Sequence, residues 1–195
     1  MALLRFDWDT LYRELDGCTK CGLCKGRHSI VISDGDPHAE IMFIGEGPGR
    51  EEDEQGVPFV GAAGRLFNYL LEEAGLTREE IYICNIVKCR PPQNRDPFPE
   101  EAEACLPYLR AQIALVRPKV IVCLGRIAAK YVYDSEIQIS RQRGQVKKKG
   151  AFYVIPTYHP AAILRKQELT NDFVWDLNTA RRIRDKINNG EEILV

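Results

Sequence analysis

No stretch of the 195-residue sequence approaches the run of about 18 apolar residues that a membrane-spanning helix needs. The first ten residues contain two acidic side chains and no clean apolar segment, so we expect neither an export signal nor a membrane partner. The sequence therefore predicts a cytoplasmic protein. In that reducing compartment, cysteines serve as metal ligands or buried thiols more often than as disulfides.

The chain also lacks an excess of charge, with 27 Lys and Arg against 28 Asp and Glu and a formal net charge of −1. This balance hides an asymmetry, because residues 1–100 carry 11 basic and 18 acidic side chains whereas residues 101–195 carry 16 and 10. Such a division along the chain indicates an anionic partner such as nucleic acid. The length, the 45% hydrophobic content and the absence of repeats or linkers predict one globular domain over residues 1–195.

Short apolar segments closed by glycine or polar residues alternate with longer segments of helical spacing. The expected strands are 39–45, 81–87, 120–124 and 151–156, and the expected helices are 8–15, 61–73, 100–116, 126–133 and 172–187. The acidic segment 50–56 is expected to be a loop, and the basic segment 141–150 a loop or hairpin. Strands that are apolar throughout pair in parallel between two helical layers, so the sequence predicts a three-layer α/β/α fold with about four parallel strands.

In such a sheet, ligands bind beyond the carboxyl ends of the strands. This rule brings Glu46, the segment 85–89, Gly125 and His159 to one rim. The glycine-rich segment 45–49 lacks both the third glycine of a dinucleotide-binding fingerprint and the lysine of a P-loop. We expect its glycines to let a ligand approach the backbone next to a carboxylate, with an ordinary surface turn as the alternative.

Five of the seven cysteines have the spacing of metal ligands. Cys18, Cys21 and Cys24 form a C-x-x-C-x-x-C run in a polar segment, and Cys89 and Cys105 flank a proline-rich loop. Two such pairs can supply four thiolates to one centre, and their wide spacing favours an iron–sulfur cluster while leaving zinc open. The remaining two cysteines lie within apolar strands and are expected to be buried, inert thiols: Cys84 and Cys123.

Several longer motifs together closely resemble family 4 uracil-DNA glycosylases. They are GEGPGREEDEQGVPFVG, YICNIVKCRPPQNR, the later Cys105, the Arg143–Gly144 pair and HPAAILR, and the resemblance extends from Cys18 to about Asp176. It implies a monomeric α/β/α repair enzyme with a four-stranded parallel sheet and a [4Fe–4S] cluster. Such an enzyme flips uracil out of single- or double-stranded DNA and hydrolyses its N-glycosidic bond, leaving an abasic site.

The resemblance also implies roles for individual residues. The cluster ligands would be Cys18, Cys21, Cys89 and Cys105, with Cys24 outside the pattern as a competitor of Cys21. The catalytic residues would be Glu46 and His159, the latter as a donor to a uracil carbonyl. The residues that bind the base would be Gly47, Glu52 at the C5 edge, Phe59 stacked on the ring and Asn85 at the Watson–Crick edge.

The basic half of the chain contains the residues expected to contact DNA. Arg143, Arg165 and the lysines at 147–149 are expected to bind phosphates, while Ile163 or Leu164 fills the gap left by the flipped base. Two alternatives are a binding module without catalysis and a ferredoxin-like redox protein. The binding module is disfavoured because Glu46, Asn85 and His159 are all present, whereas a relative without catalysis would be expected to have lost one of them. The redox protein is disfavoured because an electron carrier does not need so large a domain.

Overall fold

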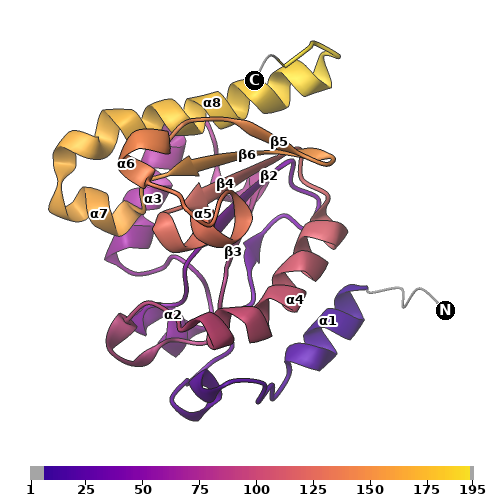
Figure 1. Cartoon of the computed structure of the whole chain (residues 1–195), viewed down its shortest axis with the longest axis vertical. Helices are drawn as coiled ribbons and strands as arrows, with labels where there is room; N and C mark the ends of the chain where they lie inside the picture. Colours follow the sequence, from indigo (N-terminus) through magenta and orange to yellow (C-terminus); the bar gives the residue numbers. More distant parts are fainter. Residues whose placement is uncertain (1–6, 194–195) are drawn as a thin grey trace.

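The computed structural model describes residues 7–193, and its centre is a six-stranded sheet in the order β1-β3-β2-β4-β6-β5 (Figure 1). The four central strands are parallel, as predicted, and a short antiparallel strand is added at each edge. The prediction of a sheet with only four strands was therefore wrong. The strands are β1 (Asp34–Gly35), β2 (Ile41–Gly45), β3 (Ile81–Asn85), β4 (Val120–Leu124), β5 (Lys147–Lys149) and β6 (Phe152–Thr157).

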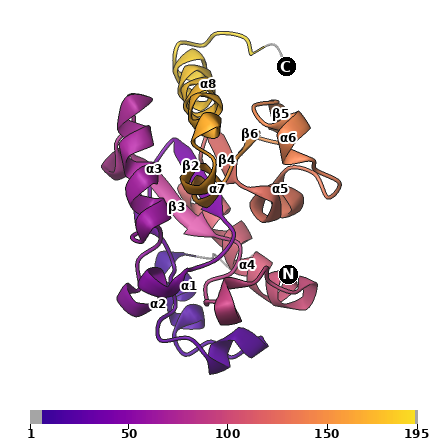
Figure 2. The same cartoon turned by 90° about the vertical axis from the view of Figure 1, so that its left-hand side faces the viewer.

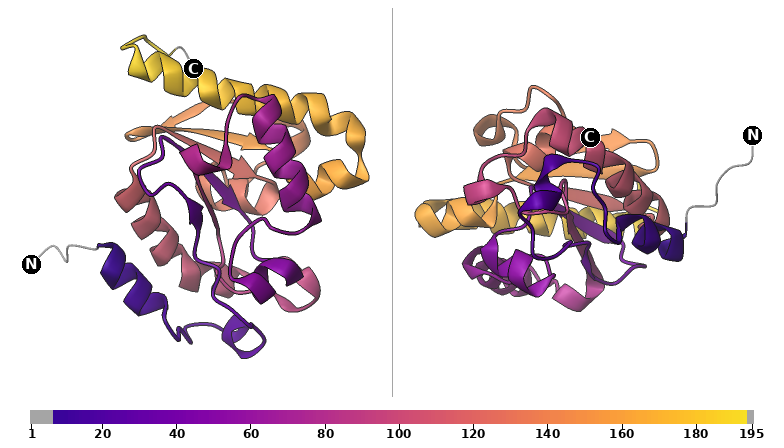
Figure 3. Two further views of the ribbon diagram at one scale, coloured as in Figure 1. Left: turned by 180° about the vertical axis from the view of Figure 1, so that it is seen from behind. Right: turned by 90° about the horizontal axis from the view of Figure 1, so that it is seen from below.

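Helices cover both faces of the sheet, which confirms the predicted α/β class. One face packs against α3 (Ala62–Glu73), α7 (Pro160–Arg165) and α8 (Thr170–Asn188). The other packs against α1 (Trp8–Leu15), α4 (Pro99–Val116) and α5 (Arg126–Val132). Figure 2 shows the sheet between α3 on one side and α5 on the other, and the left panel of Figure 3 shows α3 and α8 in front of the sheet.

The two cores follow from the alternation of side chains along the strands. In β2, Met42 and Ile44 belong to the core under α1, α4 and α5, whereas Ile41 and Phe43 belong to the core under α3 and α8. Every residue of β2, β3 and β4 is buried, so these strands are apolar on both faces. Burial on both faces explains why the sequence shows continuous apolar runs at these strands.

One of the two charged segments differs from its predicted structure, and the other agrees with it. The acidic segment expected to be a loop contains α2 (Arg50–Gln55), whose first turn holds three acidic side chains, favourable at the positive end of a helix dipole. The basic segment 141–150, predicted as a loop or hairpin, does form a hairpin: it begins in the short helix α6 (Ile139–Gln142) and continues into β5, the first strand of the hairpin, which pairs with β6. The remaining elements are 3-10 turns: Gly22–Lys25, Arg78–Glu80, Pro92–Asn94 and Gln167–Leu169.

Among residues 7–193, the helices are all too short or too polar to cross a lipid bilayer.

Candidate active site at the carboxyl ends of the strands

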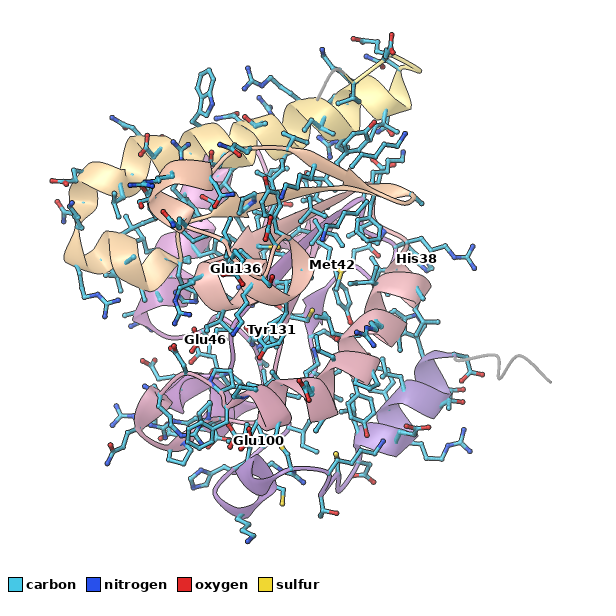
Figure 4. All side chains as sticks on the ribbon, viewed as in Figure 1. His38, Met42, Glu46, Glu100, Tyr131 and Glu136 are labelled. Carbon is cyan, nitrogen blue, oxygen red and sulfur yellow. The ribbon has the colours of Figure 1, made fainter. Side chains whose placement is uncertain are left out.

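Three of the four parallel strands, β2, β3 and β6, end around one open cavity of about 520 Å³, whereas Gly125 at the end of β4 is not among the residues that line it. All six residues expected to act in catalysis or bind the base line it together: Glu46, Gly47, Glu52, Phe59, Asn85 and His159. They come from the segments that follow β2, β3 and β6 and from the chain around α2, so the fold brings together positions more than a hundred residues apart. Glu46, labelled in Figure 4, lies in that view between α7 and α2.

Asn85 is the last residue of β3, and its side chain is 2% exposed. Its Oδ1 atom is buried and has no hydrogen-bond partner among the described residues. An unpaired buried acceptor is costly in a folded protein, so its presence on a cavity wall indicates a ligand with a matching donor.

Gly45, directly before Glu46, was not singled out by the sequence beyond the general permissiveness of its glycine-rich segment. A Cβ atom at Gly45 would lie 2.4 Å from Asn85 Oδ1 and 2.7 Å from Cζ of Phe59. The glycine therefore leaves room for two side chains of the pocket. This differs from the expected role, which was close approach of a ligand to the backbone.

Phe59 presents its ring to the cavity and is 6% exposed. Its ring centroid lies 5.7 Å from that of His159 and 5.4 Å from that of Phe67. The backbone at Phe59 has a φ of 54°, a left-handed conformation that is uncommon for an aromatic residue. Arg78 contributes to holding it, because its Nη1 donates to the Phe59 carbonyl at 3.2 Å. Such strain, fixed by its surroundings, is typical of functional sites.

His159 is the N-cap of α7, and its Nδ1 accepts a hydrogen bond from the backbone N–H of Ala161 at 3.1 Å. Loss of solvent around the ring, followed by the positive charge of Arg165, lowers the pKa of His159 to about 4. The imidazole is therefore neutral at pH 7. Since Nδ1 is an acceptor, the remaining proton is on Nε2, which can act as a neutral donor.

Glu46 is the carboxylate at the mouth of the cavity. Burial raises its pKa to about 7, the negative charge of Asp96 adds to this effect, and Arg126 opposes it. Arg126 and Asp96 form an ion pair at the same edge of the cavity. Glu46 therefore changes its charge close to neutral pH, as groups that take part in chemistry often do.

Glu52 has a more specific environment than the sequence indicates. Its Oε1 accepts hydrogen bonds from the backbone N–H groups of Val60 at 3.0 Å and Gly61 at 2.8 Å. Gly61 is the N-cap of α3, so the Glu52 carboxylate satisfies N–H groups at the start of that helix. This fixes a negative charge on the cavity wall, and the predicted contact of Glu52 with the C5 edge of a base stays a prediction.

The residues expected to contact DNA differ in their exposure. Leu164 is 47% exposed, and Arg165 is exposed and lines the cavity. Ile163 is only 1% exposed and packs in the core beneath α7. Insertion into a base stack requires an exposed side chain, so of the two residues only Leu164 has the exposure that the predicted role needs.

Arg143 has other partners than the predicted phosphate. Its Nε donates to Asp176 Oδ2 at 2.8 Å, and its Nη1 lies 3.2 Å from Asp172 Oδ1. Asp176 is buried and also accepts from the Thr157 hydroxyl at 2.6 Å. The guanidinium charge is thus already compensated inside the protein, and Arg143 would have to leave Asp176 to bind a phosphate.

The loop between Cys89 and α4 forms another wall of the cavity, which the sequence did not indicate. Asn94, Arg95 and Asp96 all line it. Arg95 is held in place by two hydrogen bonds of 2.8 Å to the Glu101 carboxylate. Its guanidinium also lies 3.7 Å from the centroid of the Phe98 ring. Arg95 therefore braces the loop, and its charge is compensated by Glu101.

The five predicted thiols meet at the base of this loop, because Cys89 begins it and Cys105 lies on α4, which follows it. Cys18, Cys21, Cys24, Cys89 and Cys105 line one small cavity, although they come from three separate segments of the chain. Burial raises the pKa of Cys89 to about 11, with Arg27 acting in the opposite direction from 3.4 Å. The thiols surround the cavity instead of converging on a point, and within residues 7–193 no three potential ligands are arranged around a single ion.

The other two cysteines behave as predicted. Cys84 and Cys123 are fully buried in β3 and β4, and burial raises the pKa of both thiols. The two remaining histidines are away from the cavity: His38 is exposed, and His28 binds the buried carboxylate of Asp53 at 2.9 Å.

Comparison with known proteins gives consistent results. Residues 32–180 match the model of the family described as the uracil DNA glycosylase superfamily. A type-4 uracil-DNA glycosylase of Archaeoglobus fulgidus is 47% identical over 176 residues, which cover 86% of this chain and 88% of the relative. A type-4 enzyme of Thermotoga maritima is 46% identical over 168 residues, covering 84% and 88%, respectively. A third, from Sulfurisphaera tokodaii, is 42% identical over 184 residues, covering 90% and 84%.

Proposed function

The chain belongs to the uracil DNA glycosylase superfamily, and from this premise we propose that it is a type-4 uracil-DNA glycosylase that excises uracil from DNA. The reaction hydrolyses the N-glycosidic bond and leaves an abasic site, as the first step of base-excision repair. We further propose that residues 1–195 act as one domain and as a monomer in the cytoplasm.

The observation that carries the proposal is the unpaired Oδ1 of Asn85 on a cavity wall shared with Phe59. Uracil has a donor at N3 and an acceptor at O4, so the Asn85 amide complements it with Oδ1 and Nδ2. Cytosine presents the opposite pattern and would leave buried groups unpaired, which is a large penalty. Stacking on Phe59 would contribute on the order of 1–3 kcal/mol for any base, so Asn85 supplies the selectivity.

Cleavage of the bond leaves negative charge on the departing uracil and positive charge on the sugar. The neutral His159 can donate from Nε2 to O2 of uracil, where this negative charge develops. A neutral donor suits this role because it stabilises the anion without transferring its proton. In the ionised state, Glu46 can stabilise the cationic sugar or orient the attacking water.

A base in a duplex must first leave the stack. Leu164, exposed at the end of α7, would fill the gap, and the adjacent Arg165 would bind a neighbouring phosphate. Both residues lie within six positions of His159, so contact with DNA and contact with the leaving base would come from the same short helix.

The thiol-lined cavity fits a [4Fe–4S] cluster by the chemistry of its donors. Cys18, Cys21, Cys89 and Cys105 would hold it, with Cys24 as a fifth thiol on the same cavity. When bound, the cluster would supply a covalent link between the N-terminal segment and the loop 89–105. This role is structural, because that loop also forms a wall of the base pocket.

The test is incubation of the purified protein with an oligonucleotide that contains one uracil, followed by alkaline cleavage of abasic sites. We expect a strand break at the uracil, and none in matched oligonucleotides with cytosine or thymine at that position. Asn85→Asp should either admit cytosine or abolish activity. If the uracil oligonucleotide stays intact with the cluster-loaded protein, the proposed function is wrong.

A further inference from the structure

Lys88 is one of the largest fully buried side chains in the molecule, with an exposure of 1%. Its Nζ donates to the backbone carbonyl of Asn85 at 2.6 Å. Asn85 is the end of β3, so this bond fixes the backbone of the residue whose side chain faces the base pocket. Nothing in the mechanism above uses this lysine.

The ammonium group of Lys88 has no carboxylate beside it among the described residues. Among the ion pairs of residues 7–193, none involves Lys88, so no carboxylate lies within 4.0 Å of its nitrogen. A buried charge without compensation costs several kcal/mol or more. One carbonyl dipole satisfies one donor, but it does not neutralise the charge.

The compensating charge can come from the neighbouring cavity. Lys88 lines that cavity together with Cys18, Cys21, Cys89 and Cys105. Thiolates and inorganic sulfides outweigh the charge of the irons in a cluster held by four cysteines, so the loaded centre is anionic. The segment 85–89 thus borders both sites: Asn85 lines the base pocket, and Lys88 and Cys89 line the thiol-lined cavity.

We propose that Lys88 is a positioning residue that couples the thiol-lined cavity to the base pocket. Its ammonium group holds the Asn85 carbonyl and takes its counter-charge from the cluster thiolates. Uracil recognition and the properties of the cluster therefore depend on the same side chain. The inference rests on the proposed function, because it assigns Lys88 a part in reading uracil.

The experiment compares wild type with Lys88→Met, which keeps the length and removes both charge and donor. Two quantities are measured on the anaerobically reconstituted protein: the affinity for free uracil by calorimetry, and the midpoint potential of the cluster by spectroelectrochemical titration. We expect about tenfold weaker uracil binding, the effect of one lost hydrogen bond. We also expect a more negative potential, because removal of a nearby cation disfavours the reduced cluster.

Lys186→Met is the matched control, since Lys186 is exposed on α8 and should leave both quantities unchanged. If Lys88→Met does not fold, Lys88→Leu removes the same charge and the same donor with a shorter apolar side chain and carries the same test. The proposal requires both quantities to change, so a change in only one of them, or in neither, overturns it. Neither measurement uses DNA cleavage, so a wild-type protein that fails to excise uracil overturns the proposed function without deciding the role of Lys88.

Discussion

The base pocket borders the middle of the loop 89–99 and the thiol-lined cavity borders its base, and the two sites are built differently. The pocket takes Asn85 from the end of a strand, His159 from the cap of a helix and Phe59 from a backbone braced by Arg78. The thiols come from a 3-10 turn and its approach, the start of the loop and α4. The pocket is thus positioned by the sheet and its helices, whereas the thiols are brought together by segments that need a further link.

This difference predicts that substitutions in the thiol-lined cavity also disturb the base pocket, whereas substitutions in the base pocket leave the thiol-lined cavity intact. The largest effect is expected for Cys89→Ser. Cys89 is buried and begins the loop that carries Asn94 and Asp96 to the base pocket, so loss of its thiolate should abolish iron retention and with it most of the activity. Iron and sulfide content, the brown absorbance and uracil excision are measured on the same preparation.

Cys24→Ser is the matched control for that experiment, because Cys24 lines the same cavity but lies outside the proposed ligand set. It should retain iron and activity. If Cys24→Ser loses the cluster and Cys21→Ser keeps it, Cys24 is the ligand in place of Cys21. A colourless Cys89→Ser protein that still excises uracil at the wild-type rate would show that the base pocket does not depend on the thiol-lined cavity.

The next largest effect is expected for His159→Ala, on the pocket side of the comparison. Loss of a donor aimed at developing negative charge typically lowers kcat by about 10²–10³-fold. Iron content should stay at the wild-type level, because His159 is not among the residues that line the thiol-lined cavity. Single-turnover rates under saturating enzyme separate the chemical step from DNA binding, and an unchanged rate would contradict the catalytic role of His159.

The two regions also differ in what the sequence could predict. Continuous apolar runs fixed the four parallel strands, and the rule for their carboxyl ends brought Glu46, Asn85 and His159 to one rim before the structure was known. The edge strand β1 is not predicted, and β5 is predicted only as part of a loop or hairpin, because runs of two or three residues carry no periodicity. The helix α2 was missed because its stability comes from end charges and tertiary contacts rather than from an apolar face.

Residue roles were harder to predict than residue positions. Arg143 looks like a phosphate-binding residue in the sequence, yet it is bound by two carboxylates of its own chain. Ile163 and Leu164 are both aliphatic residues that the sequence does not distinguish. Only the orientation of α7 about its axis determines which of them is exposed. Likewise, Gly45 is required by two side chains that lie 14 and 40 positions further along the chain, a contact that no local pattern contains.

Gly45→Ala tests that contact and should have a smaller effect than His159→Ala. The added methyl group would clash with Asn85 and Phe59. Both side chains, which are proposed to contact the base, must therefore shift, while His159 stays in place. Excision should fall by about 10–100-fold, chiefly through KM, for a strain of about 1–3 kcal/mol. Gly26→Ala is a suitable control, because a Cβ there meets nothing within 4 Å. Wild-type KM in Gly45→Ala would contradict the packing role of Gly45.

The smallest effect is expected from pH, and it concerns Glu46 alone. Burial raises its pKa from 4.5 to about 7, so its ionised fraction rises from about one tenth at pH 6 to about nine tenths at pH 8. If the carboxylate form is the active one, single-turnover excision should rise about tenfold over this interval, and Glu46→Gln should remove the dependence.

The free energy of unfolding should change with pH in the opposite direction to the rate. A carboxyl group whose pKa is higher in the folded protein stabilises the fold below pH 4.5, and this contribution is lost as the pH rises towards 7. Urea unfolding at pH 4.5 and pH 8 should therefore show wild type losing more stability than Glu46→Gln. A flat rate profile combined with that stability difference would leave Glu46 titrating in the pocket but not acting in the reaction.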